Sequence, residues 1–542
     1  MTAGRRSAVA ADLRGSGRAR VRNVVFVVLL LVWAAFLAAH AGPYASGSDQ
    51  SGYLNIARLL AEGRVAEQVR EIQGVPMHRF DPWCFTPLGF RPGPDPGVLL
   101  PAYPFGLALH QLVASWLVGL SRAAALVDVG AGTLMLWLLY RLGRSFGLTR
   151  PWAAAATVIF AASPLTIHFY TWAMSDGVAT AWCTAAVYFA RKSAKDARYA
   201  ALSGLALGVA VLVRPTDVLV VPAIVVAMSW TRASALWLVL GAAPAVVGFA
   251  VYDTILFGSP FHTGYGDMGR FFAWDHFWPR VIHFSQWLGR LWTPLAPLLF
   301  LAVVPRALRG DRRAVTLLVW FGAFAGFYAF YRFSNEAWWY LRFIMPGLPA
   351  FLVGALYEAR QAGLWVAARR PWTPRLRRTG AVALVLVGLL AVGTSLRWVR
   401  HYSVLELGRG ERAYPKGIAW MERHVEPNAV IVSMQMSGAL FFYSRHPIVR
   451  SDIVAPRDLD RLLEFTRRAG TPVYALVFEF EVDALLERFP GVFEDFGQSG
   501  RSRLFRLAPP ARPSDRMEPG QGRAGDIGDN GDAAPRRDGR RR

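Results

Sequence analysis

The chain has 542 residues, of which 54% are hydrophobic and only 18% are charged. Soluble domains carry about 25% charged residues, so this composition excludes an ordinary water-soluble protein and indicates a polytopic membrane protein. The formal net charge is +23, but the basic residues gather in short loops and in the first twenty residues. That distribution is typical of cytoplasmic loops in membrane proteins, so nucleic acid is not an expected partner.

The N-terminal part is a basic arm, residues 1–22, followed by an apolar segment from Asn23 to His40. No cleavage site of small residues follows, so we expect this first span to be retained rather than removed as a signal peptide. Only two cysteines are present, Cys84 and Cys183, which excludes a disulfide framework.

A new helix is expected directly after the first span. Ser48 and Asp49 carry the short oxygen-bearing side chains that favour a helix start. Tyr53, Ile56 and Leu60 recur at helical spacing, which predicts a helix lying in the membrane interface. Asp49 would then be a carboxylate at the lipid–water boundary, suited to act as a general base on a substrate that arrives through lipid. The alternative is that Asp49 only caps the helix.

The basic loops set the sidedness of the spans. The loops that begin near Arg141, Arg191, Arg306 and Arg369 are expected in the cytoplasm, together with the N-terminus. The segment Leu99–Leu120 contains prolines and a histidine, so we interpret it as re-entrant or interfacial. This leaves about eleven crossings of the inner (plasma) membrane and places the C-terminal region outside the cell. The other apolar segments are Asn23–His40, Ala123–Tyr140, Trp152–Phe169, Val178–Ala190, Tyr199–Val213, Val218–Trp230, Leu236–Tyr252, Leu288–Val304, Ala314–Phe330, Leu341–Tyr357 and Ala381–Leu396.

Charged residues then fall on the same outer face as Asp49. Asp176 lies between two spans, where it could also serve as a helix cap. Arg214 interrupts a long apolar run, and a guanidinium there suits a phosphate, although it could instead snorkel and pair with Asp217. Arg342 follows a cluster of aromatic residues, which is a common position for an interfacial arginine.

The stretch around His262 and Tyr265 follows a span and could line a sugar site, although turn chemistry explains its glycines and proline equally well. Histidines elsewhere show no metal-binding spacing, so a histidine-based metal site is not expected. Beyond the spans, alternating strand and helix patterns predict a small extracytoplasmic α/β domain over residues 401–508. The tail, residues 509–542, has no apolar periodicity and is predicted to be disordered.

Four stretches of the chain resemble the GT-C-fold glycosyltransferases, the broad group that contains protein O-mannosyltransferases and the aminoarabinose transferase acting on lipid A. A weaker similarity is Arg342-Phe343 with Pro346 and Pro349. The resemblance extends over roughly residues 24–356 and leaves out the C-terminal region. The four stretches are Ser48 to Arg58, Ala102 to Leu109, Ala162-Ser163-Pro164 with Ala173-Met174-Ser175-Asp176, and Gly204 to Thr216.

This resemblance implies a GT-C-like fold for the all-α polytopic domain, residues 23–400. It also implies transfer of a sugar from a polyprenyl-phosphate-linked donor to an acceptor hydroxyl on the extracytoplasmic face, with inversion. The acceptor would be a lipid, a glycan or a protein. Asp49 would be the general base and Asp176 a second acid of the site. The candidate substrate-binding residues are Tyr53, Arg58, Tyr103, Arg214, His262, Tyr265 and Arg342.

A divalent cation is a candidate cofactor, but many members of the group have Asp-Glu in the first loop where this chain has Asp49-Gln50. Two other functions are weighed against the enzyme. A transporter or lipid flippase would place charges at mid-membrane and show repeated halves, whereas the acids here are at one rim. A non-catalytic assembly or sensor protein would act through the C-terminal domain and would need no acids at that rim.

Overall fold

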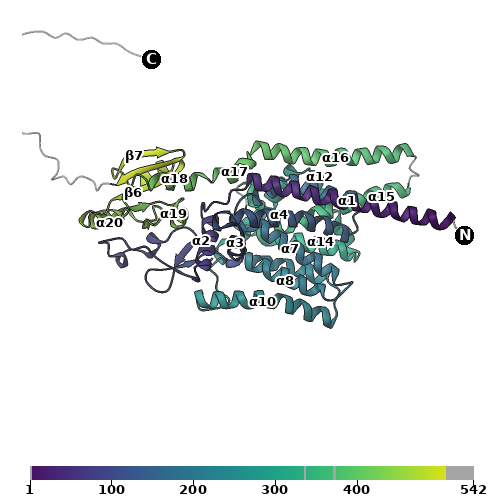
Figure 1. Cartoon of the computed structure of the whole chain (residues 1–542), viewed down its shortest axis with the longest axis horizontal. Coiled ribbons are helices and arrows are strands. Elements are labelled where there is room, and N and C mark those ends of the chain that lie inside the picture. The colour runs from purple at the N-terminus through teal and green to yellow at the C-terminus, as the bar shows by residue number, and fades with distance from the viewer. Residues whose placement is uncertain (1–2, 335–336, 370–373, 508–542) are drawn as a thin grey trace, which may run out of the picture.

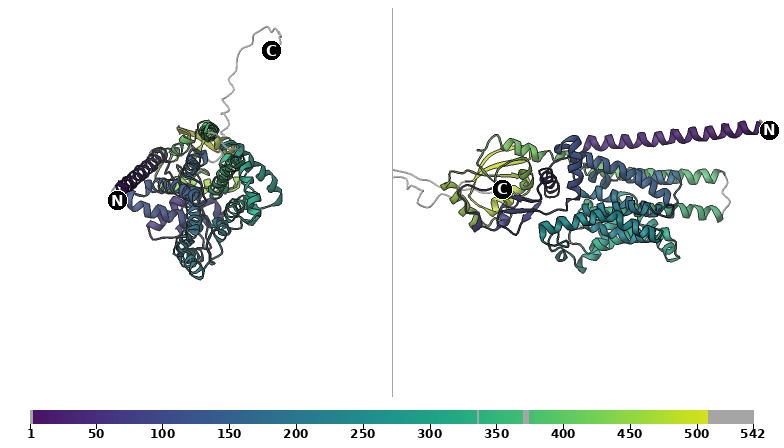
Figure 2. Two further views of the ribbon diagram at one scale, coloured as in Figure 1. Left: turned by 90° about the vertical axis from the view of Figure 1, so that its right-hand side faces the viewer. Right: turned by 60° about the horizontal axis from the view of Figure 1, so that its bottom comes forward.

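The computed structural model describes residues 3–334, 337–369 and 374–507. Within them the chain forms a bundle of helices that run along one axis, with a small sheet domain at one end (Figure 1). The first helix, α1 (Ala3–His40), extends beyond the bundle at the end away from this domain (Figure 2). The tail predicted over residues 509–542 lies outside the described residues.

The bundle is interrupted where proline or glycine breaks a span. The segment predicted as one span at 152–169 forms two helices, because Pro164 follows Ser163 and lacks the amide hydrogen that would continue the first. The helices of the bundle after α1 are α4 (Leu120–Ser145), α5 (Arg150–Ala162), α6 (Pro164–Phe169), α7 (Ser175–Lys192), α8 (Tyr199–Val213), α9 (Val221–Ala227), α10 (Arg232–Phe257), α11 (Phe277–Leu291), α12 (Leu295–Leu301), α13 (Val303–Leu308), α14 (Arg312–Ala329), α15 (Leu348–Arg369) and α16 (Pro374–His401).

Within the described ranges, four helical segments are long and apolar enough to cross a membrane, and a fifth would be a pair bent by 119°. Few residues of the first span or of α10 are buried in the protein, although both are strongly apolar. Such surfaces are stable in lipid and not in water, so the chain is a multi-pass membrane protein. The number of eleven crossings and the orientation of the termini stay predictions. The segments are Asn23–His40, Leu120–Ser145, Arg232–Phe257, Trp338–Arg369, and the pair Trp274–Leu291 with Leu295–Leu308.

Short helices and strands lie between the bundle and the sheet domain. Helix α2 (Asp49–Ala61) begins at the residue predicted, and α3 (Phe105–Val118) follows the proline-rich segment. With 14 residues, α3 is shorter than the ~20 needed to cross a bilayer. A three-stranded antiparallel sheet, which the sequence patterns did not predict, precedes α3 in the order β1-β3-β2. Its strands are β1 (Glu67–Gln68), β2 (Phe90–Pro92) and β3 (Val98–Pro101).

The C-terminal region contains a five-stranded mixed sheet in the order β5-β4-β6-β8-β7. The central strand, β6, is buried along its whole length, which its continuous apolar sequence requires. Strand β5, strand β7 and three of the helices (α17, α19 and α21) have no counterpart in the sequence prediction. The elements are α17 (Val404–Gly410), α18 (Ala413–Met421), β4 (Val430–Val432), α19 (Ser437–Tyr443), β5 (Ile448–Val449), α20 (Pro456–Arg468), β6 (Val473–Phe478), α21 (Glu479–Arg488), β7 (Phe493–Ser499) and β8 (Ser502–Leu507).

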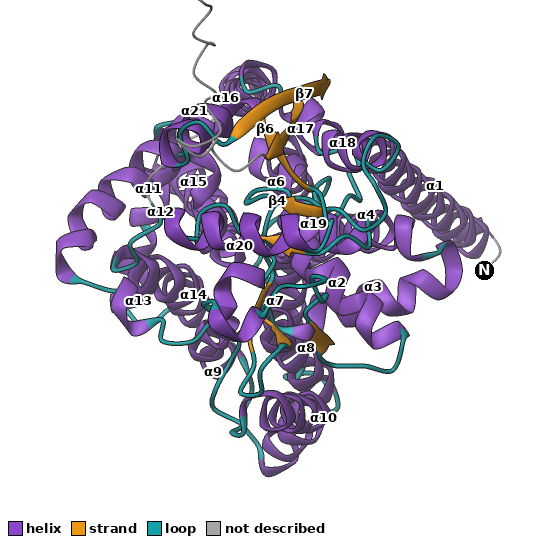
Figure 3. Cartoon of the chain, turned by 90° about the vertical axis from the view of Figure 1, so that its left-hand side faces the viewer, coloured by secondary structure: helices purple, strands orange, loops and turns teal. Residues whose placement is uncertain are grey.

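The sheet domain covers the end of the bundle at which α2 and α3 lie (Figure 3). Its helix α19 packs directly on α2. Asn55 Nδ2 donates to the carbonyl oxygen of Gly438 at 3.1 Å, and the site of a Cβ on Gly438 would be occupied by the Ser51 hydroxyl. The domain is thereby fixed to the helix that begins with Asp49.

Candidate active site

Asp49 is the first residue of α2, and its carboxylate is not used to cap that helix. The preceding Ser48 makes no side-chain capping bond either. Instead, Asp49 Oδ1 accepts a hydrogen bond from the Tyr103 hydroxyl at 2.6 Å, and Oδ2 accepts one from Arg342 Nη2 at 2.7 Å. The Asp49 side chain keeps 23% of its surface exposed. Its carboxylate is therefore held by two donors and is still reachable from outside.

Asp176 is the second residue of α7 and is completely buried. Its Oδ1 accepts hydrogen bonds from Arg214 and from Arg342 Nε, the latter at 3.0 Å, while Oδ2 has no described partner. The first turn of a helix stabilises a negative charge, and two guanidinium groups compensate the loss of water. Asp176 therefore contacts two arginines and caps no helix.

One guanidinium joins the two carboxylates. Arg342 lies in a 3-10 helix, η6 (Trp338–Gly347), and bonds to Asp49 through Nη2 and to Asp176 through Nε. The Phe343 ring lies 5.5 Å from the same guanidinium. The two acids that the basic loops assigned to one face therefore share a single cation. Such a cluster fixes its members against one another, because removing any of them would leave a poorly solvated charge.

Arg214 ends α8 in an extended conformation, with φ −146° and ψ 109°. The following Pro215 disfavours helical geometry for the residue before it, so the chain turns there and α8 stops. The Arg214 side chain is buried and pairs with Asp176. The alternative pairing with Asp217 is not the one found. The two positive charges of Arg214 and Arg342 therefore balance the two negative charges of Asp49 and Asp176.

Three tyrosines adjoin the carboxylates. Tyr103 also bonds to Ser48 Oγ at 2.8 Å, and Tyr53 donates to Ser175 Oγ at 3.0 Å. Burial and the nearby Asp49 carboxylate raise the pKa of Tyr53 to about 12 and that of Tyr103 well above its usual range. Both phenols therefore stay protonated near neutral pH and act as donors. The Tyr265 ring meets Tyr103 edge to face, with the ring centroids 5.9 Å apart.

Two of the candidate residues are placed elsewhere. Arg58 donates to the carbonyl oxygens of Phe441 and Phe442 at 3.1 and 3.3 Å, so it satisfies the C-terminal turn of α19. These bonds direct its side chain toward the sheet domain, and a role for it in substrate binding stays a prediction. His262 is exposed in the loop after α10 and lines a separate cavity. The sequence did not indicate that Ser48 and Ser175 bond to tyrosine hydroxyls, because serine at a helix start suggests only capping.

The donor set does not fit a metal ion. Among the described residues, no group of three or more His, Cys, Asp and Glu side chains is placed to share one. Asp49 and Asp176 do converge, but the guanidinium of Arg342 already bridges them.

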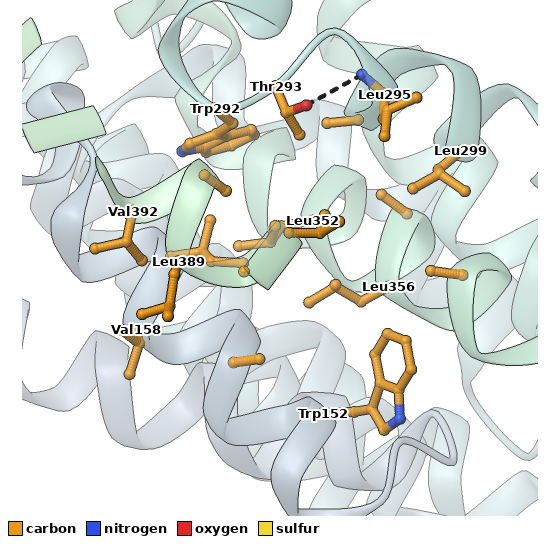
Figure 4. Close-up of a pocket in the computed structure, with 18 of the residues that line it drawn as sticks. Trp152, Val158, Trp292, Thr293, Leu295, Leu299, Leu352, Leu356, Leu389 and Val392 are labelled. Atoms are coloured by element: carbon orange, nitrogen blue, oxygen red, sulfur yellow. Dashed lines mark hydrogen bonds between the residues drawn. The ribbon is translucent and has the colours of Figure 1, made fainter. Parts of the chain in front are cut away.

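An apolar cavity of about 390 Å³ lies elsewhere in the bundle, among α5, α12, α15 and α16. Trp152, Leu299, Leu356 and Leu389 are among the side chains that line it, and none of the lining residues is ionisable (Figure 4). A hydrocarbon chain is the only ligand chemistry that such walls favour. This cavity carries none of the acids or bases that catalysis requires.

Comparison with solved structures identifies the architecture. The chain is similar to ArnT from Cupriavidus metallidurans bound to undecaprenyl phosphate, with a TM-score of 0.53 and 18% sequence identity over 89% of this chain and 97% of ArnT. ArnT in the apo state gives the same TM-score and identity over 90% and 98%. The Archaeoglobus fulgidus oligosaccharyltransferase tethered to an acceptor peptide gives a TM-score of 0.49 and 12% identity over 90% of this chain and 74% of that one.

No protein-family model matches the chain, and no curated protein matches it in sequence. The similarity to ArnT covers most of both chains. It shows that this protein has the GT-C fold, as the sequence resemblance implied.

Proposed function

We propose that the protein is an integral-membrane glycosyltransferase that transfers a sugar from a polyprenyl-phosphate-linked donor to an acceptor hydroxyl, with inversion. The observation that carries this proposal is the bridge from Arg342 to both Asp49 and Asp176 at the end of the bundle covered by the sheet domain. The GT-C fold supports it, as does the undecaprenyl phosphate bound in the ArnT structure. The reaction takes place at the outer surface of the plasma membrane, to which the basic loops assign this end.

Asp49 is the general base. A base must reach the proton that it removes, and Asp49 is the acid of the pair with exposed surface. Tyr103 and Arg342 hold its two oxygens in defined positions, so the carboxylate is oriented before the acceptor arrives. Asp176 is completely buried and cannot reach an acceptor, so it acts as a positioning residue for Arg214 and Arg342.

The arginines bind the phosphate of the donor. Arg342 uses Nε and Nη2 for the two acids, which leaves Nη1 for an anionic oxygen of a ligand. A guanidinium suits a phosphate because its N–H groups match the spacing of the oxygens. Arg214 adds positive charge from the buried side of the same cluster.

In the transfer step, the acceptor hydroxyl gives its proton to Asp49 as its oxygen forms a bond to the anomeric carbon. The bond from that carbon to the phosphate oxygen breaks on the opposite face, which inverts the configuration. Polyprenyl phosphate leaves with one more negative charge than it had as a diester. Arg342 and Arg214 stabilise this developing charge, which is the kind of interaction that lowers an activation barrier most.

The test is the variant Asp49→Asn in membranes supplied with a panel of polyprenyl-phosphate sugars labelled in the sugar. Asparagine keeps the size of the side chain and can still accept from Tyr103, but it cannot take a proton. We expect transfer to fall by about 10²–10⁴-fold, the usual contribution of a general base. Asp95→Asn, an exposed acid in the loop between β2 and β3, is the matched control and should transfer normally. Unchanged transfer by Asp49→Asn would remove Asp49 from the mechanism.

A further inference from the structure

A second cavity, of about 890 Å³, adjoins the carboxylate cluster without being part of it. One wall is the hairpin of β2 and β3, and the other is the end of α10 with the loop that follows it. Arg91, Thr254, Phe257, His262 and Thr263 are among its lining residues. Polar and aromatic side chains together, in a cavity open to the outside, are the combination that binds a saccharide.

Arg91 is the one arginine or lysine among the residues that line this cavity. Its guanidinium is half-buried and lies 5.8 Å from the centre of the Phe257 ring. Its one hydrogen bond is a long contact of 3.5 Å with the carbonyl oxygen of Gly264, and it forms no ion pair with any described carboxylate. Asp267 lines the same cavity, but its carboxylate accepts from the Gly269 amide. A half-buried cation without a counter-ion is suited to an anion supplied by a ligand.

The loop that forms the cavity wall also reaches the proposed base. Tyr265 is not among the lining residues and contacts Tyr103, which in turn donates to Asp49. Gly264, directly before it, lies against the carbonyl oxygens of Pro101 and Ala102, where a Cβ would come within 2.6 Å of both. This close packing fixes the position of the loop. Gly266 lines the cavity, and Tyr265 directly before it contacts Tyr103. The loop therefore connects a ligand in the cavity to the tyrosines beside Asp49.

We propose that this cavity binds the acceptor, and that Arg91 recognises a phosphoryl or carboxylate group on the acceptor sugar. The identification of the ligand as the acceptor rests on the proposed function. The binding of an anionic saccharide to this cavity does not depend on catalysis. Arg91 is then a specificity residue: it selects acceptors that carry a negative charge. His262, at the same cavity, supplies a further hydrogen-bonding group.

The experiment measures equilibrium binding to the purified full-length chain in a neutral detergent, by calorimetry, with glucose 1-phosphate and with glucose. The variants are Arg91→Gln and, as a matched control, Arg270→Gln, an exposed arginine of the same loop that does not line the cavity. We expect the wild type to bind the sugar phosphate but not glucose. Arg91→Gln should weaken this binding about tenfold or more, the usual loss for a charge-assisted hydrogen bond, and Arg270→Gln should not.

A failure of this binding proposal can be distinguished from a failure of the proposed function. The titration measures binding without any sugar transfer, so its outcome for Arg91→Gln does not depend on whether Asp49→Asn abolishes transfer. Wild-type binding by Arg91→Gln, or no binding by the wild type, would overturn the proposal. A phospholipid head group is the other source of an anion at this depth, so the titration is repeated in nanodiscs with phosphatidylglycerol. Loss of sugar-phosphate binding there, but not in phosphatidylcholine nanodiscs, would assign Arg91 to lipid and equally overturn the proposal.

Discussion

Replacing Arg342 tests the bridge on which the proposed site depends. In Arg342→Gln, the 2.7 Å bond to Asp49 and the 3.0 Å bond to Asp176 are both lost as charged interactions. Arg214 still pairs with Asp176, so the buried acid keeps one partner, whereas Asp49 keeps only the Tyr103 hydroxyl. Arg342→Lys is the companion variant, because a single ammonium cannot reproduce two bonds from two nitrogens of one rigid fork.

Two effects contribute to the expected size of the loss. Removing one donor that stabilises transition-state charge lowers kcat by roughly 10²–10³-fold. Removing one member of a buried charge pair costs about 3–5 kcal/mol of stability, of which the remaining Arg214 pairing retains a part. We therefore expect kcat to fall about 100-fold or more, together with a lower thermal midpoint. Arg342→Lys should recover stability more than it recovers kcat.

The assay compares initial rates of labelled-sugar transfer at saturating donor with thermal unfolding of the same preparations. Arg332→Gln is the control, because Arg332 is an exposed arginine of the preceding segment whose side chain lies over the Phe333 ring and contacts neither Asp49 nor Asp176. Rates within about twofold of the wild type for Arg342→Gln, in a protein of unchanged thermal midpoint, would refute the role assigned to the bridge.

Two further outcomes are expected. Gly438→Ala should lower the thermal midpoint of the sheet domain and reduce transfer, because its added Cβ would collide with the Ser51 hydroxyl between α19 and α2. Gly410→Ala is the control, because Gly410 is also a helical glycine and its Cβ would enter open space; equal effects of the two variants would contradict the close packing. Transfer should continue after EDTA treatment and dialysis, because Arg342 provides the positive charge between Asp49 and Asp176. Loss of activity in EDTA that Mg²⁺ or Mn²⁺ restores would show that a metal is needed.

The start of α2 and the closeness of the two acids were accessible to sequence reasoning. Capping chemistry located the helix at Ser48-Asp49, and the basic loops placed Asp49 and Asp176 on one face. The sequence could not show which arginine joins them, because Arg342 is separated from Asp49 by 293 positions. Three arginines of the same chemical type were candidates, and only the packing of η6 against α7 distinguishes them.

The orientation of Arg58 relative to Asp49 follows from their spacing in the sequence. Asp49 and Arg58 are nine residues apart on one helix, which is about two and a half turns. They therefore point to opposite faces of α2, and Arg58 meets α19 while Asp49 faces the bundle. The hairpin at 90–101 was hidden for another reason. Pro92 and Pro101 are at the ends of its strands, where proline is tolerated, so its composition is that of a loop.

The contact between α19 and α2 joins segments that are far apart in the order of synthesis. Asn55 and Gly438 are 383 residues apart, so the ribosome has produced most of the chain before they can meet. The helix that begins with Asp49 is therefore synthesised long before the helix that packs on it. Until the C-terminal region has been made, α2 lacks the contacts through Asn55 and Ser51 that attach it to the sheet domain.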